Sequence, residues 1–223
     1  MCGRYTLAAG SEELVEAFDV PPLSFAWAAR YNIAPGQEVP VAAADRRGRR
    51  IGLLTWGLVP GWVDEPGTAL VNARSESVME KPSFREAFER RRCLVPADGF
   101  YEWRCAGSER IPHWFFPRED ALLSFAGVWE RWSRPGLAPR HTFAIVTAGA
   151  SEDVAPVHDR MPVIIHAGDR TRWLDRSAGP RNLAALLRPA PPGSLECRVV
   201  SARVNRVAED DPALIEPAAP RVG

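Results

Sequence analysis

Short runs of apolar residues, separated by turns rich in glycine, proline and charged residues, recur along the chain and predict a strand-rich fold. Strands are expected at 1–7, 39–44, 51–57, 93–96, 99–103, 113–116, 121–128, 141–147, 163–165 and 196–200. The second and third of these flank a turn and therefore predict a β-hairpin. The four arginines of that turn, at 45–50, are typical of a solvated hairpin tip, and a nucleic-acid contact is the alternative.

Helical spacing occurs in four places between these strands, at 11–18, from 81 onward, at 170–174 and at 181–187. Ser11 precedes two acidic residues and is expected to cap the first helix. Ser83 and Glu86 have the spacing of a capping box at the start of the second helix. Because these helices are few and short, the pattern favours a mixed fold dominated by strands.

The chain has 223 residues, of which 46% are hydrophobic, and can therefore bury one sizeable core. Internal repeats, low-complexity tracts and long linkers are absent, so we expect one domain over 1–218 followed by a tail over 219–223. The sequence contains no secretion signal and no apolar run long enough to span a bilayer, which predicts a cytoplasmic protein without membrane association. In that compartment its four cysteines are expected to be reduced thiols.

No Cys-x-x-Cys or His-x₃₋₅-His spacing occurs, so we expect no metal and no other cofactor. Basic and acidic residues number 28 each, and the overall charge therefore neither supports nor excludes nucleic-acid binding. Lys81 is the only lysine, and it precedes a proline in a polar turn where its amine is expected to stay protonated. If amine chemistry occurs, the α-amine of Cys2 is the better candidate.

Cys2 follows the initiator methionine directly and becomes the N-terminal residue when Met1 is removed. It then carries an α-amine with a usual pKa of about 7.7–8.0 beside a thiol with a usual pKa of about 8.5, so both are partly deprotonated near neutrality. Such a 1,2-aminothiol condenses with an aldehyde to a Schiff base, which the thiol closes to a thiazolidine. The amine can instead act as base for its own thiol, as in N-terminal-nucleophile amidases. A small residue buried in the first strand is the remaining interpretation.

Three further positions combine a reactive or aromatic side chain with a turn or a strand. Glu102 stands inside an aromatic strand: facing the core it gains a raised pKa suited to acid–base chemistry, and facing solvent it follows ordinary alternation. His158 stands in a loop before an apolar run, and loops on a rigid scaffold often carry chemistry. Trp62 follows a Pro-Gly turn, where it either stacks on a nucleobase or covers the edge of the core.

Six ordered motifs make the chain similar to the SOS-response-associated peptidase family, abbreviated SRAP, whose members process abasic sites. The motifs are MCGRY at 1–5, YNIAPG at 31–36, WGLVPGW at 56–62, NARSE at 72–76, GFYEW at 99–103 and HDRMP at 158–162. The resemblance extends over nearly the whole chain. It implies an α+β fold with a single SRAP domain. In this domain, mixed sheets would form a partly closed antiparallel β-barrel with flanking short helices, and the domain would carry a DNA-binding cleft.

The resemblance also implies an activity. After autoproteolytic removal of Met1, the aminothiol would capture the ring-opened aldehyde of an abasic site in single-stranded DNA as a thiazolidine crosslink that protects the lesion. The catalytic residues that it implies are Cys2, Asn72, Glu102 and His158. The DNA-binding residues that it implies are Arg4, Asn32, Pro35, Trp62, Arg74, Trp103 and Arg160. We accordingly expect a cytoplasmic monomer that joins the nucleoid when it is on DNA and whose partner is single-stranded DNA containing abasic sites.

Within this resemblance each catalytic residue has an expected role. Asn72 would hydrogen-bond the sugar or position the crosslink, Glu102 would be the acid/base near the α-amine, and His158 would assist ring opening and crosslink turnover. Arginines would hold phosphates, because the planar guanidinium fork suits oxyanions. One position departs from the family pattern: Gly61 precedes Trp62 where many members have a second bulky residue, so we expect a weaker wedge into DNA.

Three other functions fit parts of the sequence. A glutamine amidotransferase also begins Met-Cys-Gly, but it needs an Asn-Gly oxyanion loop, and no Asn-Gly dipeptide occurs. A cysteine peptidase would pair Cys2 with His158, although nothing in the sequence outlines a peptide-binding groove. A single-strand-binding module would leave Cys2 inert, and replacing Cys2 with alanine separates that function from crosslinking.

Overall fold

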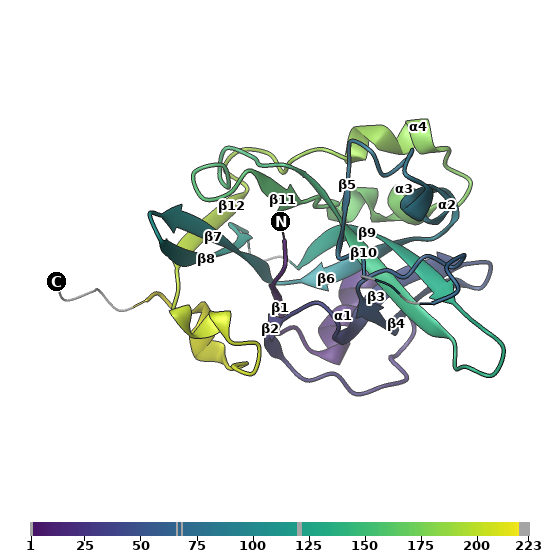
Figure 1. The fold of residues 1–223 in the computed structure, drawn as a ribbon, viewed down its shortest axis with the longest axis horizontal. Coiled ribbons are helices and arrows are strands. Elements are labelled where there is room, and N and C mark those ends of the chain that lie inside the picture. Colours follow the sequence, from purple (N-terminus) through teal and green to yellow (C-terminus); the bar gives the residue numbers. More distant parts are fainter. Residues whose placement is uncertain (1, 66, 68, 120–121, 219–223) are drawn as a thin grey trace.

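Two β-sheets form most of the molecule (Figure 1). The computed structural model describes residues 2–65, 67, 69–119 and 122–218. The expected strand positions Met1 and Ala121 and the expected tail over 219–223 lie outside the described residues.

The first sheet has the strand order β12-β8-β7-β1-β2, and all of its neighbours are antiparallel. Its strands are β1 (Tyr5–Leu7), β2 (Arg30–Ile33), β7 (Gly99–Ala106), β8 (Glu109–Pro117) and β12 (Leu195–Val199). The short β1 therefore lies between β2 and β7, and it carries the N-terminal motif into the interior of the molecule.

The second sheet runs β11-β10-β4-β3-β6-β9, with β5 beside β10. Its strands are β3 (Glu38–Asp45), β4 (Gly48–Trp56), β5 (Asn72–Arg74), β6 (Arg92–Ala97), β9 (Leu123–Trp132), β10 (Arg140–Gly149) and β11 (Arg160–Pro162). β9 also pairs with β10 through six residue pairs, so the sheet curls back on itself. Because β4 and β10 meet through only two residue pairs, in parallel, the barrel is partly closed. The expected α+β fold with a partly closed barrel is confirmed.

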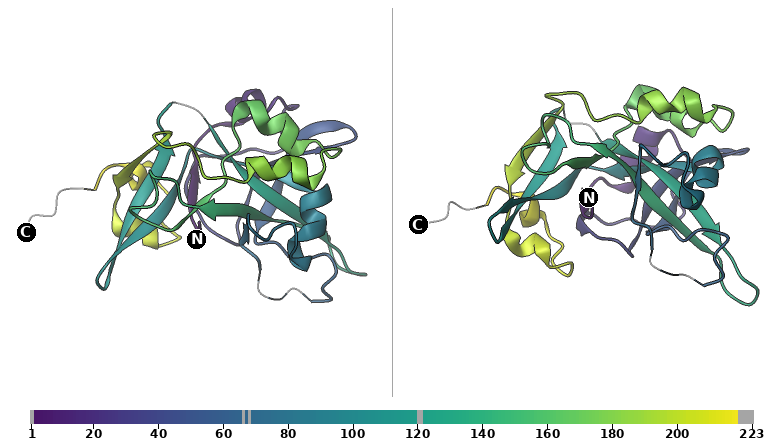
Figure 2. Two further views of the ribbon diagram at one scale, coloured as in Figure 1. Left: turned by 90° about the horizontal axis from the view of Figure 1, so that it is seen from above. Right: turned by 45° about the horizontal axis from the view of Figure 1, so that its top comes forward.

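The helices are short and lie outside the sheets (Figure 2). They are α1 (Ser11–Phe18), α2 (Pro82–Arg90), α3 (Arg170–Leu174) and α4 (Pro180–Leu183), with 3₁₀ turns η1 (Ala167–Asp169), η2 (Ala184–Leu186), η3 (Ala202–Asn205) and η4 (Pro212–Ile215). Both predicted caps are wrong. Gly10 is the N-cap of α1 and Lys81 that of α2, and neither helix has a side-chain capping bond. Pro82, at the start of α2, has no N–H that would need a cap.

Two strand predictions also need correction. The run at 163–165 is not a strand, since the Val163 N–H donates to the Val146 carbonyl in β10 whereas the Ile165 N–H donates to the Ser124 carbonyl in β9. This segment therefore crosses between two strands, and the strand itself, β11, ends just before it. The YNIAPG motif at 31–36 begins inside β2, which is not among the predicted strands. The hairpin predicted around 45–50 is confirmed as β3 and β4.

A cluster of buried aromatic rings fixes β1 at the junction of the two sheets. The Tyr5 ring packs edge-on against Trp56, with ring centroids 5.3 Å apart, and against Phe125 at 5.9 Å. Phe100 of β7 contacts the same Phe125 ring at 6.0 Å. Because Tyr5 belongs to the first sheet and its two partners to the second, packing of these rings positions the preceding residues, including Cys2. Trp56 is fully buried.

Candidate active site

Cys2 lies at the inner end of the N-terminal segment, and its side chain is fully buried. The segment is held by the antiparallel pairing of Tyr5 with both Ile33 and Phe100, and by the Tyr101 N–H, which donates to the Arg4 carbonyl at 3.0 Å. Burial, together with the negative charge of Glu102, raises the pKa of the Cys2 thiol well above its usual range. While Met1 is attached, the thiol is therefore protonated at neutral pH.

Asn72, the first residue of β5, contacts the Cys2 backbone. Its Nδ2 atom donates to the Cys2 carbonyl at 2.9 Å. Its Oδ1 atom is buried and accepts no hydrogen bond from any residue that the structure describes. β5 reaches this position because it pairs in parallel with β10, Asn72 lying opposite Ile145. Asn72 thus holds Cys2 and presents one unused acceptor beside it.

Glu102 of β7 is a buried carboxyl group, with 2% of its surface exposed. Its neighbour in the register is His113 of β8. The pKa of Glu102 is raised to about 7. Burial is the main cause, and the negative charge of Asp159 contributes a smaller part of the increase. At neutral pH the carboxyl group is therefore about half protonated, as a general acid/base requires. Of the two orientations left open by the sequence, Glu102 has the inward one.

His158 lies beside this carboxyl group, with its Nε2 atom 3.8 Å from Glu102 Oε2. The Nδ1 atom of His158 lies 2.9 Å from the Arg160 backbone nitrogen and 3.2 Å from the Arg160 carbonyl oxygen. Asp159 Oδ1 lies 3.1 Å from the same Nδ1 atom. Burial lowers the pKa of His158 below its usual value, so the ring is neutral at pH 7.

A cavity of about 470 Å³ opens beside these groups. It is lined by Gly3, Arg4, Glu102, Trp103, Arg110, His158 and Asn205. The structure thus brings together the four predicted catalytic residues, Cys2 and Asn72 through their hydrogen bond and Glu102 and His158 at the cavity. Arg110 and Asn205 were not predicted, because neither lies in one of the six motifs. The feature that could have indicated Arg110 is its place in β8, the strand that pairs with the GFYEW strand β7.

The predicted arginines differ in what they already bind. Arg4 donates to Asn32 Oδ1 at 2.7 Å, to the Val204 carbonyl at 2.6 Å and to the Asn205 carbonyl at 3.3 Å. Arg160 forms a two-point ion pair with Glu76, at 2.5 and 3.0 Å, and donates to the Thr147 carbonyl at 2.6 Å.

Arg74, at the end of β5, is exposed. Of the three predicted arginines it has the most accessible side chain for a phosphate contact.

Asn32 is fully buried. Its Nδ2 atom donates to the carbonyls of Val204, Arg206 and Glu209. Because this side chain has no exposed surface, its position fits a role in holding the C-terminal turns and not the direct DNA contact expected from the resemblance.

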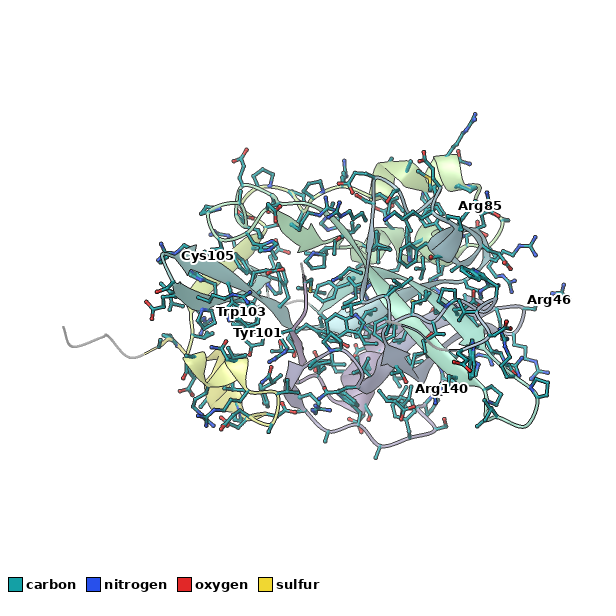
Figure 3. The ribbon with its side chains drawn as sticks, in the orientation of Figure 1. Arg46, Arg85, Tyr101, Trp103, Cys105 and Arg140 are labelled. Carbon is teal, nitrogen blue, oxygen red and sulfur yellow. The ribbon has the colours of Figure 1, made fainter. Side chains whose placement is uncertain are left out.

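The other predicted DNA contacts lie nearer the surface. Pro35 is exposed. Trp62 exposes 65% of its surface, so it does not cover the edge of the core. Trp103 is half-buried and donates through Nε1 to Asn205 Oδ1 at 2.8 Å. Trp103 lies at the opposite end of the molecule from Arg46 of the hairpin turn at 45–50 (Figure 3).

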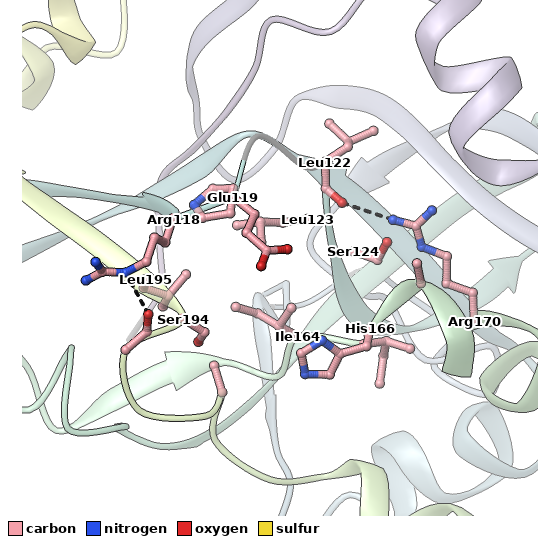
Figure 4. A pocket seen from close by; sticks show the side chains of 15 residues that line it. Arg118, Glu119, Leu122, Leu123, Ser124, Ile164, His166, Arg170, Ser194 and Leu195 are labelled. Atoms are coloured by element: carbon pink, nitrogen blue, oxygen red, sulfur yellow. Dashed lines mark hydrogen bonds between the residues drawn. The ribbon is translucent and has the colours of Figure 1, made fainter.

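A larger cavity, of about 550 Å³, lies where β9, β12 and α3 begin (Figure 4). Its walls are mainly apolar, with Leu123, Ile164 and Leu195 among them, and Arg170 donates to the Leu122 carbonyl at its rim. No residue of the six motifs lines it. Cavity size therefore does not identify the site, whereas the convergence of ionisable groups does.

Within the part of the chain that the structure describes, no group of three or more histidine, cysteine, aspartate or glutamate residues could hold a metal ion. No helix in the same part is long and apolar enough to cross a membrane. The four cysteines are free thiols, with Cys93 buried and both Cys105 and Cys197 exposed.

Comparison with known proteins identifies relatives over the full length of the chain. The family model of the SOS response associated peptidases (SRAP) matches residues 1–207. The abasic site processing protein YoqW of Bacillus subtilis is 36% identical over 222 residues, covering 97% of this chain and 99% of the relative. The abasic site processing protein HMCES of Gallus gallus is 33% identical, covering 84% of this chain and 66% of the relative.

Solved structures show the same fold. A protein from Bacteroides thetaiotaomicron superposes with a TM-score of 0.87 at 24% identity, covering 98% of this chain and all of the other. A phage-related protein from Bordetella bronchiseptica superposes with a TM-score of 0.72 at 28% identity, covering 89% of this chain and 94% of the other.

Proposed function

The chain belongs to the SOS response associated peptidase family, and from that premise we propose that it crosslinks covalently to abasic sites in single-stranded DNA through the Cys2 aminothiol. The names of the relatives, abasic site processing proteins, support the choice of lesion. The crosslink would protect the lesion from cleavage. We also propose that the protein acts as a cytoplasmic monomer that joins the nucleoid when it is on DNA.

The proposed reaction has two steps. With Met1 removed, the α-amine of Cys2 adds to the C1 aldehyde of the ring-opened sugar, and the carbinolamine loses one water to give an imine. The thiol then adds to the imine carbon, forming the S–C bond, while its proton passes to the nitrogen. The product is a thiazolidine whose mass is that of protein plus DNA minus one water. No oxidant or reductant is consumed.

The observation that carries the proposal is the buried Glu102 carboxyl group, whose pKa is raised to about 7, beside Cys2 and 3.8 Å from His158 Nε2. A carboxylate accepts the proton that the attacking α-amine releases, and the acid form returns a proton to the departing hydroxyl of the carbinolamine. His158, neutral at pH 7, is the group proposed to accept the C1 hydroxyl proton of the closed sugar, while the acid form of Glu102 protonates the ring oxygen, so that the C1–O bond of the ring breaks and the aldehyde forms.

Asn72 supplies positioning in this scheme. Its hydrogen bond to the Cys2 carbonyl fixes the N-terminal residue, and its buried Oδ1 atom is available to accept a hydrogen bond from the α-amine or from a sugar hydroxyl. Asn72 would thus hold Cys2 by both its carbonyl and its α-amine. This would keep the amine close to the geometry in which it attacks the aldehyde.

The proposed path of the DNA follows the exposed residues of the site. Arg74 would bind a phosphate directly, and Arg160 would do so after exchanging Glu76 for the phosphate oxygens. Trp62 would stack on an exposed base, and Pro35 and Trp103 would form edge contacts. Arg4 would act at the cavity wall, with most of its donors directed to the protein.

Removal of Met1 by the chain itself is the second activity that we propose, on the ground that the family is named as a peptidase. With His158 as base, the Cys2 thiol would add to the Met1 carbonyl carbon, the Met1–Cys2 amide bond would break with a proton passing to the freed α-amine of Cys2, and one water would hydrolyse the resulting thioester to release methionine in a single turnover. A wild-type chain that loses Met1 when made in a translation system without aminopeptidase, and a Cys2→Ala chain that retains it there, are the expected results. Met1 retained by both chains would overturn self-removal and leave crosslinking intact.

The test of crosslinking is a denaturing gel with three labelled single strands of one sequence. One strand carries an abasic site, one carries a tetrahydrofuran analogue that cannot open to an aldehyde, and one is undamaged. We expect a slow-migrating adduct with the first strand alone. An adduct with all three strands would show chemistry unrelated to the aldehyde, and no adduct from protein lacking Met1 would overturn the proposal.

A further inference from the structure

Two arginines, Arg4 and Arg110, line the cavity beside Glu102 and His158. Arg4 is engaged by Asn32, Val204 and Asn205, as described above. Among the described residues, none accepts a hydrogen bond from the Arg110 guanidinium or forms an ion pair with it. Arg110 is therefore the cation at this cavity whose donors remain available.

Packing holds Arg110 in place although it is exposed. Its guanidinium carbon lies 5.7 Å from the centre of the Trp103 ring. The register of β7 and β8 places Trp103 opposite Pro112 and Cys105 opposite Arg110, so Arg110 and Trp103 are diagonal neighbours across the hairpin. Trp103 in turn is fixed by its hydrogen bond to Asn205. A guanidinium stacked in this way loses little further freedom when it binds a ligand.

A positive charge at this cavity would offset the negative charge of two nearby carboxyl groups. Glu102 gains negative charge as pH rises through about 7, and the exposed Asp159 lies 3.1 Å from His158 Nδ1, so either carboxylate would repel a polyanionic strand entering the cavity. The charge of Arg110 acts in the opposite direction, since it lowers the pKa values of both Glu102 and His158. Arg110 is thus close enough to influence the reacting groups and exposed enough to reach the DNA backbone.

We propose that Arg110 is a phosphate-binding residue for the strand segment that passes over the β7–β8 hairpin. This inference rests on the proposed function and adds a binding residue to it. The phosphate oxygens would accept hydrogen bonds from the N–H groups at the edge of the Arg110 guanidinium, while the face of the guanidinium stays stacked on the Trp103 ring. The abasic sugar would then lie beside Glu102 and His158, in the cavity that Arg110 lines.

The experiment compares Arg110→Ala with Arg104→Ala. Arg104 is exposed on the same hairpin but does not line the cavity. Because each variant loses one positive charge, a difference between them reports the position of the arginine and not the change in net charge. Binding of an undamaged single-stranded oligonucleotide is measured for both variants in the Cys2→Ala background at several salt concentrations. The slope of log K for binding against the logarithm of the salt concentration is negative, and we expect Arg110→Ala to make it less negative by about 0.7. This is the change for one lost phosphate contact on a single strand. Arg104→Ala should keep the slope of the parent.

An unchanged slope for Arg110→Ala, or an equal change in both variants, would overturn the assignment. Arg110→Lys keeps the charge without the planar fork, and we expect it to keep most of the slope. Circular dichroism of each variant checks that the hairpin still folds. Because crosslinking by the wild-type protein is measured separately, failure of the Arg110 assignment can be told apart from failure of the proposed function.

Discussion

His158 Nε2 and Glu102 Oε2 lie 3.8 Å apart, although 56 residues separate them in the chain. Each group affects what the other can do. The imidazole directs its Nε2 atom toward a carboxyl group that is about half ionised at pH 7. An incoming group between them could receive a proton from one side and give a proton to the other. We therefore propose the pair as an acid–base centre next to Cys2.

Replacing Glu102 with glutamine tests this centre kinetically. Glu102→Gln keeps the size of the side chain but cannot exchange a proton, so we expect the crosslinking rate to fall about 10²- to 10⁴-fold. The wild-type rate should rise as pH passes through about 7, where Glu102 ionises, and the variant should lack the part of this rise that comes from the carboxylate. Single-turnover crosslinking between pH 5.5 and 8.5, the range that brackets this pKa, provides the measurement.

Glu12→Gln, at an exposed position of α1, is the matched control and should follow the wild-type profile. Equal rates for Glu102→Gln and wild type at every pH would remove Glu102 from the mechanism.

The same carboxyl group makes folding stability depend on pH. The pKa of Glu102 is about 7 in the folded protein against a usual value of 4.5, so the folded state binds the proton more tightly than the unfolded state. Stability is therefore greatest below the unfolded pKa and is lost as pH rises through the folded value, by about 3 kcal/mol at most. Urea unfolding of wild type and Glu102→Gln at pH 5 and pH 8 should show a smaller loss for the variant. Identical losses would contradict a raised pKa.

The hydrogen bond from Asn72 to the Cys2 carbonyl predicts a rate effect without loss of the nucleophile. Asn72→Ala removes a bond whose net worth is about 0.5–1.5 kcal/mol, so we expect a fall in crosslinking rate of about 2- to 12-fold from this bond alone. Asn72→Asp keeps the shape but loses the donor and should fall at least as far. Asn182→Ala, at an exposed position of α4, should match wild type. A wild-type rate for Asn72→Ala would show that the bond does not position Cys2.

Glu76 competes with phosphate for Arg160 if the proposed DNA path is correct. In Glu76→Gln the two-point ion pair is lost and the Arg160 fork becomes free, so single-stranded DNA should bind more tightly. An exposed pair of this kind is worth about 0.2–1 kcal/mol, which corresponds to an increase in affinity of up to about 5-fold. Glu80→Gln, an exposed neighbour, controls for the change in net charge. Weaker binding by Glu76→Gln than by Glu80→Gln would mean that Glu76 instead holds Arg160 in position.

The sequence was informative about strands and about motif residues, and less so about contacts between distant segments. The hairpin at 45–50 follows from local pattern, whereas the sequence left open whether Trp62 is exposed or covers the core, and the structure shows it exposed. The burial of Asn32 does not, because the turns that cover it come from residues 204–209, far along the chain. Arg110 was missed for a related reason. Only the register of β7 and β8 brings it over Trp103, and no motif marks it.

The caps of α1 and α2 show a second limit of local pattern. Ser11 and Ser83 have the spacing of capping residues, yet both lie inside their helices. Pro82 accounts for part of this, because proline favours the first helical position and so starts α2 one residue before Ser83.

Intact mass of the protein after incubation with an abasic single strand tests the central claim most directly. For protein lacking Met1 the account predicts one adduct, equal to protein plus oligonucleotide minus one water, that survives denaturation without a reducing agent. Cys2→Ser keeps the α-amine but lacks the thiol, so its adduct should appear only after reduction of the imine with borohydride. Chains that retain Met1 should give no adduct. A stable adduct on Cys2→Ala, or none on wild type lacking Met1, would contradict the aminothiol mechanism.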